Sequence, residues 1–534
     1  MGKIVNIDEA QALEGVERDW AYNALDCTGP LEIARNLLPR LDKQTQRTYE
    51  FELAMQGPAL AMMRRGVLVD DMVRAASVAG LRREIAQQVR AVNALPLLVE
   101  KWDGWVLNTG KCKKSRRKDG RHSWPRGVPD GHGRLCEACG ASRIARAEFN
   151  PNSADQVNHL FYSLLALPKQ RNKKGKFSVD EDVLERIGRR WPAYKALTDA
   201  FLSVRDLAKQ IGFLSARLTP DSRFPSSFNV GTAWTGRWSS SKNPEGYGSN
   251  LQNVAERHRN IFIADPGMEL FYADLEQAES RAVAYLSGDE AYIEAHLSGD
   301  VHTFACRRIW PDLPWTGDMA RDKAIAKASP PWDPVPGHDW RFQAKRIQHG
   351  SNYGLSPQGI AMIAHIPLRE ARVAYRAYFE AFPKIKAWHR FEARAVEGQE
   401  PLVNPLGRRC RLFGRPWDAH TFKQGLAFKP QSLVADVLNV GLWRVWRELD
   451  PKPILLLSQV YDAIMGEWPV GARMEAARAV ARLMLIPIPI TDIYGVARVM
   501  VIPVEVSAGA NWRKFNDDDK KGPLNLGGQR KIEL

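Results

Sequence analysis

The spacing of apolar and polar residues divides the chain into long helical stretches, separated by shorter stretches with the pattern of strands or loops. Gly66 is expected to end the helical stretch 50–65. A loop rich in Pro and Trp at 329–340 is expected to interrupt the helical stretch 291–400. Helical spacing predicts helices over 1–45, 50–65, about 71–100, 150–215 and 291–400.

Two stretches have the composition of strands instead. Residues 267–273 follow a turn and are rich in β-favouring side chains, which predicts a strand. Residues 453–470 predict a hairpin with a tight turn at Tyr461-Asp462. The pattern is mixed over 216–290, whereas 101–148 are irregular, rich in Gly, Lys and Arg, and resemble an insertion between two helical regions.

The chain is strongly basic. Its 534 residues include 76 Lys and Arg against 61 Asp and Glu, a net charge of +15. This excess favours nucleic acid as a partner, because each neutralised phosphate releases a condensed counterion. No membrane span is expected, since no run of 18 apolar residues occurs, and the first residues lack the apolar core of a signal peptide. We therefore expect a cytoplasmic protein of several subdomains.

Two carboxylates stand where predicted strands end. Asp274 follows the predicted strand 267–273, and Glu279 comes five residues later. Asp462 lies in the predicted hairpin turn. An acid at a strand end is usually a solvated turn residue, so each of these carboxylates alone is a weak signal.

A third segment adds cations on a predicted helix. Arg341, Lys345, His349 and Tyr353 follow one another at steps of four. Each step turns the helix by only about 40° beyond a full circle, so the four side chains line one face. Cations and an aromatic ring on one face suit a triphosphate and a base. Because a charged helix face is often only solvated, the argument depends on the order and spacing of all three segments.

In this order the segments 272–281, 341–354 and 460–462 resemble motifs A, B and C of the family A DNA polymerases, the bacterial DNA polymerase I family. The resemblance covers roughly residues 46–515. Further segments that resemble signatures of the family are 149–156, 235–240, 250–253, 300–302, 405–409 with Gln431 and Asp436, and 509–512.

The resemblance implies an α+β right-hand polymerase fold with DNA in its cleft. The expected subdomains are a palm with an antiparallel sheet (216–290 and 401–534), helical fingers (291–400), a helical thumb (46–215) with the insertion 101–148 at its tip, and a remnant of the C-terminal end of an exonuclease domain (1–45).

The resemblance also implies template-directed addition of dNTPs to a primer 3′-hydroxyl, with two Mg²⁺ ions. Asp274, Asp462 and the backbone carbonyl of Leu275 are the expected metal ligands. Lys345 is the expected general acid and also a phosphate contact. The other expected contacts are Arg341 and His302 to phosphates, Tyr353 beside the nascent base pair, Glu279 as the group that excludes a 2′-hydroxyl, Gln277 and His349 near the nucleotide, and Arg237 and Gln431 in the minor groove near the primer end.

The sequence departs from the family pattern in two motifs. Motif C usually reads His-Asp-Glu and is Tyr461-Asp462-Ala463 here. We expect activity to survive, because the lost Glu is secondary to the metal ligand, and we expect Tyr461 to donate a hydrogen bond to the primer phosphate. His349 stands where motif B usually has Phe or Tyr.

The segment from Tyr22 to Asp26 resembles the last motif, Tyr-x-x-x-Asp, of the family's proofreading exonuclease; an ordinary helix is the alternative. The two earlier exonuclease motifs have no counterpart here, so no 3′→5′ exonuclease activity is expected. With the divergent motifs B and C, this arrangement suggests a bacteriophage replication enzyme acting in the host cytoplasm. A separate exonuclease or a processivity subunit is then an expected partner.

The insertion carries three of the six cysteines. Cys136 and Cys139 form a Cys-x-x-Cys pair that suits one tetrahedral Zn²⁺, with Cys112 as the expected third ligand and His132 or His122 as the fourth. A segment with so little apolar content needs such a staple. Free thiols are the alternative. The surrounding Lys and Arg favour a contact with DNA, or with a processivity partner.

Two other functions share parts of this pattern. A single-subunit RNA polymerase uses similar Asp, Arg, Lys and Tyr residues, but Glu279 and the supporting segments argue against it. A non-catalytic DNA-binding protein of the same fold is the second alternative, and the retention of Asp274, Asp462, Arg341 and Lys345 argues against that. Primer extension with dNTPs and with rNTPs distinguishes the three.

Overall fold

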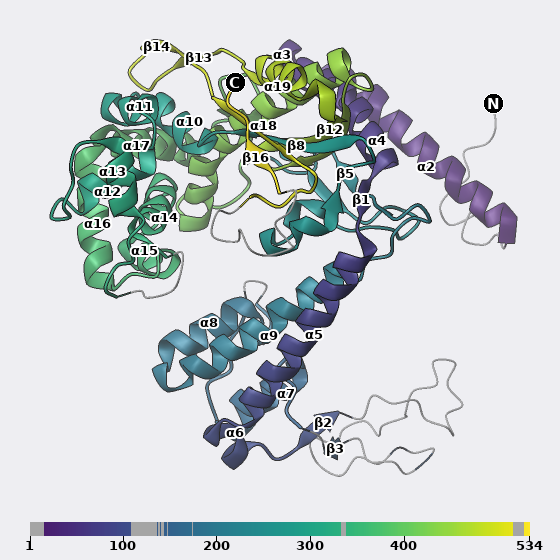
Figure 1. The fold of residues 1–534 in the computed structure, drawn as a ribbon, viewed down its shortest axis with the longest axis vertical. Coiled ribbons are helices and arrows are strands. Elements are labelled where there is room, and N and C mark those ends of the chain that lie inside the picture. The colour runs from purple at the N-terminus through teal and green to yellow at the C-terminus, as the bar shows by residue number, and fades with distance from the viewer. Residues whose placement is uncertain are drawn as a thin grey trace.

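The computed structural model describes residues 15–107, 136, 139, 144–146, 148–172, 175–332, 338–515 and 528–534. Figure 1 shows a large body around a central sheet and a helical lobe that projects from it. Helix α2 (Gly15–Leu37), followed by η1 (Leu38–Arg40), lies on the opposite side of the body from helices α11–α17. The separate groups of helices and the antiparallel sheet agree with the expected α+β architecture.

The central sheet has five antiparallel strands in the order β11-β12-β8-β15-β16. The strand expected at 267–273 is the middle strand β8, and the expected hairpin is β11 and β12. The strands are β8 (Met268–Leu275), β11 (Leu455–Val460), β12 (Ala463–Pro469), β15 (Val504–Gly509) and β16 (Arg530–Lys531).

Strand β8 is an almost unbroken apolar run because both of its faces are covered. Phe271 belongs to the larger core of the body, whereas its neighbour Leu270 packs into a second core that includes Trp512. Phe271 also stacks on Trp468 of β12, with ring centroids 4.4 Å apart. Burying each of these side chains contributes roughly 1.5–3 kcal/mol, so the strand that carries Asp274 is firmly fixed.

Helices of the large body surround the sheet, and α18 is the longest of those described, with 31 residues. The helices are α10 (Ala278–Ser287), α11 (Glu290–Leu297), α12 (Val301–Ile309), α13 (Met319–Ala326), α14 (Trp340–Asn352), α15 (Pro357–Ile363), α16 (Leu368–Ala381), α17 (Pro383–Glu397), α18 (Ala419–Leu449) and α19 (Arg473–Met484).

Short strands and 3₁₀ turns connect these elements. The short strands are β1 (Val67–Val69), β4 (Arg223–Phe224), β5 (Ser227–Asn229), β6 (Ser239–Ser241), β7 (Phe262–Ile263), β9 (Leu402–Val403), β10 (Arg409–Cys410), β13 (Ile488–Thr491) and β14 (Ala497–Met500). The 3₁₀ turns are η4 (Leu251–Asn253), η5 (Glu256–Ile261) and η6 (Val470–Ala472).

The projecting lobe has a core of its own, in which Phe149 and Phe201 pack with ring centroids 5.1 Å apart. The helix expected to run to about residue 100 divides at Pro96, which begins a new helix as proline at a first helical position does. The lobe contains α5 (Asp71–Asn93), α6 (Pro96–Lys101), β2 (Trp105–Leu107), β3 (Ile144–Arg146), α7 (Ala154–His159), η2 (Leu160–Leu164), α8 (Glu181–Arg190), η3 (Pro192–Tyr194) and α9 (Lys195–Leu214).

Helices α3 (Lys43–Ala54) and α4 (Gln56–Arg65) fall largely in the range expected for the thumb, but they pack with the large body. Arg65 pairs with Asp450 and donates a hydrogen bond to the Leu456 carbonyl of β11 at 3.0 Å. Within the described parts of the chain, no helix is long and apolar enough to cross a membrane.

A buried acid in the central sheet makes the stability of the fold depend on pH. Glu467 of β12 is 1% exposed, and its Oε2 accepts the Asp265 N–H at 3.1 Å. Burial, with the charge of Asp265, raises the pKa of Glu467 to about 7. Its ordinary value is 4.5, so the folded state binds more protons than the unfolded state between these values, and stability falls as the pH rises through that window.

We therefore expect Glu467→Gln to stabilise the protein by about 1–3 kcal/mol at pH 8, because an amide keeps the hydrogen bond without the buried charge. The gain should shrink as the pH approaches 4.5. Thermal unfolding followed at several pH values measures the effect. A change in Tm that is the same at all pH values would contradict this explanation.

Candidate active site

Asp274 and Asp462 come together at one end of the central sheet. Asp274 is the next-to-last residue of β8 and pairs in register with Ala463, the first residue of β12. Asp462 directly precedes Ala463, and its carbonyl oxygen accepts the Leu275 N–H at 3.0 Å. The fold thus brings together the two expected metal ligands, far apart in sequence, with Asp274 on β8 and Asp462 in the turn before the adjacent strand β12.

The turn that carries Asp462 is strained and braced from outside. Tyr461 has a φ of 57°, which costs a residue other than glycine of order 1 kcal/mol. Its hydroxyl donates to the side chain of Asn253, and its carbonyl oxygen accepts from the Gln459 amide at 2.8 Å. Gln459 in turn accepts from the Gln252 amide at 2.8 Å. The bond from Tyr461 to a primer phosphate stays a prediction.

The surroundings disfavour the charged forms of the two carboxylates. Burial, with the nearby charge of Asp462, raises the pKa of Asp274 to about 7, and burial raises the pKa of Asp462 as well. The charges of Lys514 and Lys345 act in the opposite direction on Asp274. Two poorly solvated carboxylates that repel one another, next to the carbonyl of Leu275, are a set of hard oxygen ligands that fits a divalent cation such as Mg²⁺.

The expected phosphate-binding face lies on α14, which Asp339 caps by accepting the Phe342 N–H at 2.6 Å. Arg341 donates two hydrogen bonds to Asp300, at 2.7 and 3.0 Å. Although burial opposes it, pairing with Arg341 lowers the pKa of Asp300 to about 2. Lys345, one turn further on, is exposed and forms no ion pair with the residues that the structure describes.

Glu279 joins several of the expected contacts. It lies in the first turn of α10 and accepts hydrogen bonds from Arg237 and from the Tyr353 hydroxyl. Burial and the charge of Glu279 hold the pKa of Tyr353 well above its ordinary value, so the hydroxyl remains a donor. The ring of His349 meets that of Tyr353 edge to face, with centroids 4.9 Å apart. Motifs A and B therefore meet around one carboxylate.

The three other expected substrate contacts, Gln277, His302 and Gln431, are half-buried or buried. Gln277 precedes α10 with a φ of 52°, and its Oε1 is buried without a hydrogen-bond partner among the described residues. His302 is buried with its Nδ1 2.5 Å from Gln348 Oε1, and burial and the charge of Arg341 lower its pKa to about 4. Gln431 is half-buried on α18. Their contacts with substrate stay predictions.

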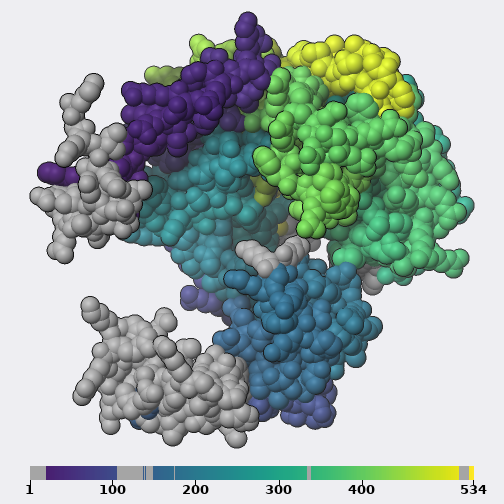
Figure 2. Space-filling view, turned by 180° about the vertical axis from the view of Figure 1, so that it is seen from behind, coloured from purple at the N-terminus to yellow at the C-terminus, as the bar shows by residue number. Residues whose placement is uncertain are grey.

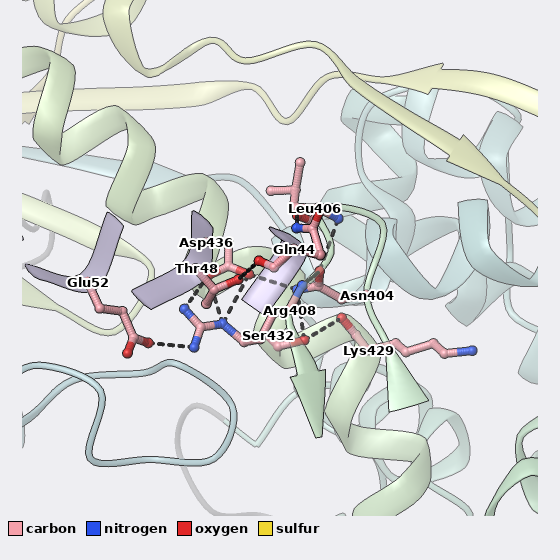
Figure 3. A network of polar contacts seen from close by, with 9 residues as sticks. All are labelled: Gln44, Thr48, Glu52, Asn404, Leu406, Arg408, Lys429, Ser432 and Asp436. Carbon is pink, nitrogen blue, oxygen red and sulfur yellow. Dashed lines mark hydrogen bonds and ion pairs between the residues drawn. The ribbon is translucent and has the colours of Figure 1, made fainter. Parts of the chain in front are cut away.

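Arg408 lies in a network of polar contacts (Figure 3) and packs against the turn that carries Arg237. Its guanidinium pairs with Asp436 at 2.8 Å and with Glu52 at 2.6 Å. A Cβ at Gly236 would lie 2.6 Å from Arg408 Cζ, so only glycine allows this close approach. The other residues drawn in the network are Gln44, Thr48, Asn404, Leu406, Lys429 and Ser432.

The sequence did not point to two further charges beside the pair Asp274 and Asp462. Glu505 of β15 pairs in register with Asp274, which puts both side chains on one face of the sheet. Lys531 of β16 lies 2.9 Å from Glu505 and 3.5 Å from Glu276. Alternation in 504–506 indicates a strand, but only the strand order shows which residue faces which.

Most of the expected zinc site lies outside the described residues, as Cys112, His122 and His132 do. Cys136 is buried and Cys139 half-buried. Where the chain is described, no three His, Cys, Asp or Glu side chains cluster as a metal site. The zinc site and its docking role stay predictions, as does the exonuclease resemblance of Tyr22 and Asp26, which lie exposed on α2.

Comparison with known proteins identifies relatives of this arrangement. The profile of DNA polymerase family A matches residues 136–514. The thermostable DNA polymerase I of Thermus aquaticus is 30% identical over 391 residues, which are 69% of this chain and 42% of the relative. The DNA polymerase I of Mycobacterium bovis is 28% identical over 379 residues, 68% of this chain and 38% of the relative.

A solved structure shares the fold. The POL domain of Pol1 from M. smegmatis, in complex with DNA primer-template and dNTP, superimposes with a TM-score of 0.61 at 22% identity. The match covers 86% of this chain and 70% of that domain. The expected polymerase fold is thereby confirmed. This chain spans about two fifths of the length of the curated relatives that it matches.

Proposed function

Because the chain belongs to DNA polymerase family A, we propose that it is a DNA-templated DNA polymerase that extends a primer with dNTPs. The observation that carries the proposal is the meeting of Asp274 and Asp462 beside the group formed by Arg237, Glu279 and Tyr353. The charge of Glu279 helps to raise the pKa of Asp462, so the carboxylate pair and this group share one site.

Asp274, Asp462 and the Leu275 carbonyl would hold two Mg²⁺ ions, which when bound activate the primer 3′-hydroxyl and neutralise the leaving pyrophosphate. The protein keeps one carboxylate near the end of β8 and the other in the turn before β12, and both side chains are half-buried. Because burial and the charge of Asp462 raise the pKa of Asp274 to about 7, metal binding near neutral pH would also release a proton from Asp274.

The cations of α14 would bind the triphosphate. Asp300 occupies Nε and Nη2 of Arg341 and so fixes the orientation of the guanidinium, which leaves Nη1 for a phosphate oxygen. Lys345 would bind phosphate and deliver a proton to the leaving pyrophosphate. His302 would be a further phosphate contact.

The remaining contacts would check the base pair. Arg237 and Gln431 would reach the minor-groove acceptors that every correct pair presents, which tests pair shape without reading sequence. Tyr353 and His349 would pack beside the nascent pair. The Oε1 of Gln277, which has no hydrogen-bond partner among the described residues, would accept a hydrogen bond from the substrate.

Glu279→Ala is expected to increase rNTP incorporation relative to dNTP by about 10- to 100-fold, since one steric and polar contact of this kind is worth about 1–3 kcal/mol. Glu279 would lie under the sugar and exclude a 2′-hydroxyl. The ratio of kcat/KM for dNTP and rNTP measures the effect. Glu276→Ala, which removes another carboxylate of motif A, is the matched control. An unchanged ratio for Glu279→Ala would place the discrimination elsewhere.

Primer extension on a template of defined sequence tests the proposed function itself. Template-directed addition of dNTPs is expected. Efficient extension with rNTPs instead would support an RNA polymerase, which shares the Asp, Arg, Lys and Tyr residues. Binding of primed template without any addition would indicate a non-catalytic DNA-binding protein.

We also propose a biological setting for this activity. The divergent motifs B and C suggest replication of a bacteriophage genome in the host cytoplasm. A separate exonuclease and a processivity subunit are the partners that we propose for this chain. A Zn²⁺ ion would stabilise the basic insertion 101–148, which would contact DNA or a processivity partner.

A further inference from the structure

The loop between β10 and α18 exposes two aromatic side chains. Phe413 is 94% exposed and Trp417 is 81% exposed, more than any other aromatic residue described. A buried Phe stabilises a fold by roughly 1.5–3 kcal/mol, and Phe413 contributes none of this. Phe413 and Trp417 belong neither to the proposed active site nor to the hydrophobic core.

The loop is nevertheless anchored on both sides of Phe413. Leu412 packs against the cluster of Val396, Leu402 and Phe428. A Cβ at Gly414 would lie 2.1 Å from Thr421 Oγ1, so Gly414 sits directly against α18. With both neighbours fixed, the ring of Phe413 is held outward by the backbone.

Positive charge surrounds the two rings. Arg411 and Arg415 flank Phe413, both are exposed, and neither forms an ion pair with a described residue. The one carboxylate of the loop, Asp418, leaves a net positive charge on residues 411–418. Bare aromatic faces interleaved with arginine are the composition that binds unpaired nucleic acid, where bases stack and phosphates lie beside cations.

A third ring connects this loop with the catalytic site. Trp234 is 41% exposed and stacks on Phe428 with centroids 5.8 Å apart and planes at 19°. Phe428 belongs to the cluster that anchors Leu412. Arg237, which bonds to Glu279, follows Trp234 by three residues, so the Cα atoms of Trp234 and Arg237 are at most about 11 Å apart. In Figure 2 the light green part of the chain, near residue 400 and beyond, lies above the blue lobe.

We propose that Trp234, Phe413 and Trp417, with Arg411 and Arg415, form a platform on which the unpaired template strand stacks outside the catalytic site. This rests on the proposed polymerase function. A single strand is the occupant because the base faces of a duplex are already stacked and offer no surface to an exposed ring. A protein partner is less well matched to two arginines without counter-charges.

The double variant Phe413→Ala with Trp417→Ala tests the platform. Each base stacked on an aromatic ring is worth about 1–3 kcal/mol, so Kd for primed template with a long unpaired overhang is expected to rise about 10-fold or more. Kd for the same duplex with a one-nucleotide overhang, and the rate of adding one nucleotide at saturating DNA, should not change. Trp20→Ala with Tyr22→Ala, which removes exposed rings from α2, is the matched control.

A second variant tests the charges. Arg411→Gln with Arg415→Gln should lower the slope of log Kd against log salt by about 0.7 for each lost phosphate contact on a single strand, again only with the long overhang. Unchanged Kd with the long overhang, or equal weakening with both substrates, would overturn the proposal. A change only in self-association, seen by sedimentation, would assign the loop to protein contact instead. If the wild-type protein binds the overhang through this loop but adds no nucleotide, the platform stands and the polymerase proposal fails.

Discussion

Replacing Asp274 or Asp462 with alanine is expected to abolish nucleotide addition and to leave binding of primed template nearly intact. Each change would remove a carboxylate that is expected to hold the metal ions, and the several kcal/mol of transition-state stabilisation that such ions supply correspond to about 10³-fold or more in rate. Affinity for DNA comes instead from many Lys and Arg contacts with phosphate. Single-turnover extension and a binding titration measure the two effects separately.

The isosteric change Asp274→Asn adds a second readout. Since burial and the charge of Asp462 raise the pKa of Asp274 to about 7, the neutral amide should raise Tm above pH 7 while activity is lost, a trade of function against stability. Glu505→Gln is the matched control, because it neutralises the acid on β15 that pairs in register with Asp274. Substantial extension by Asp274→Ala, or a loss of DNA binding as large as the loss of activity, would contradict the assignment.

Lys345→Ala is expected to lower the rate of nucleotide addition by about 10²- to 10⁴-fold, the range for loss of a general acid. Lys345 is exposed on α14 without an ion pair in the described chain, and its charge reaches both Asp274 and Asp462. Presteady-state kinetics at saturating dNTP isolates the chemical step from nucleotide binding.

The next residue provides a matched control for this prediction. Arg346 is also an exposed cation of α14, but it donates to the Ile363 carbonyl at 2.6 Å and lies over the ring of Phe342. Arg346→Ala should therefore change the rate of addition little. Equal losses for Arg346→Ala and Lys345→Ala would mean that the general charge of the helix, rather than a proton from Lys345, accounts for the effect.

The positions of Asp274 and Asp462 in the fold could be predicted from sequence because each depends on a short local segment. Asp274 follows an apolar strand and Asp462 lies in a two-residue hairpin turn, and both features persist in the fold. The four-residue spacing of Arg341, Lys345, His349 and Tyr353 likewise depends only on the geometry of one helix. Such signals do not require knowledge of how distant segments pack.

The contacts between distant segments of the site could not be predicted from sequence, because they depend on tertiary packing. Glu505 lies beside Asp274 only because β15 pairs with β8 in the sheet. Lys531 reaches Glu505 only because β16 pairs with the edge of β15. His302 shares a motif with Asp300 on α12, yet one is buried against Gln348 and the other pairs with Arg341. Their different surroundings follow from the neighbouring helix, which no linear pattern specifies.

The position of β8 in the middle of the sheet also affects how the chain is made. Its two neighbours, β12 and β15, begin about 190 and 230 residues after β8 ends. At a translation rate of about 5–20 residues per second, this apolar strand leaves the ribosome about 10–40 s before either neighbour can pair with it. Both of its edges stay open for that time, a condition that favours aggregation and chaperone binding. The feature that holds Asp274 firmly in the finished enzyme therefore makes the nascent chain vulnerable during synthesis.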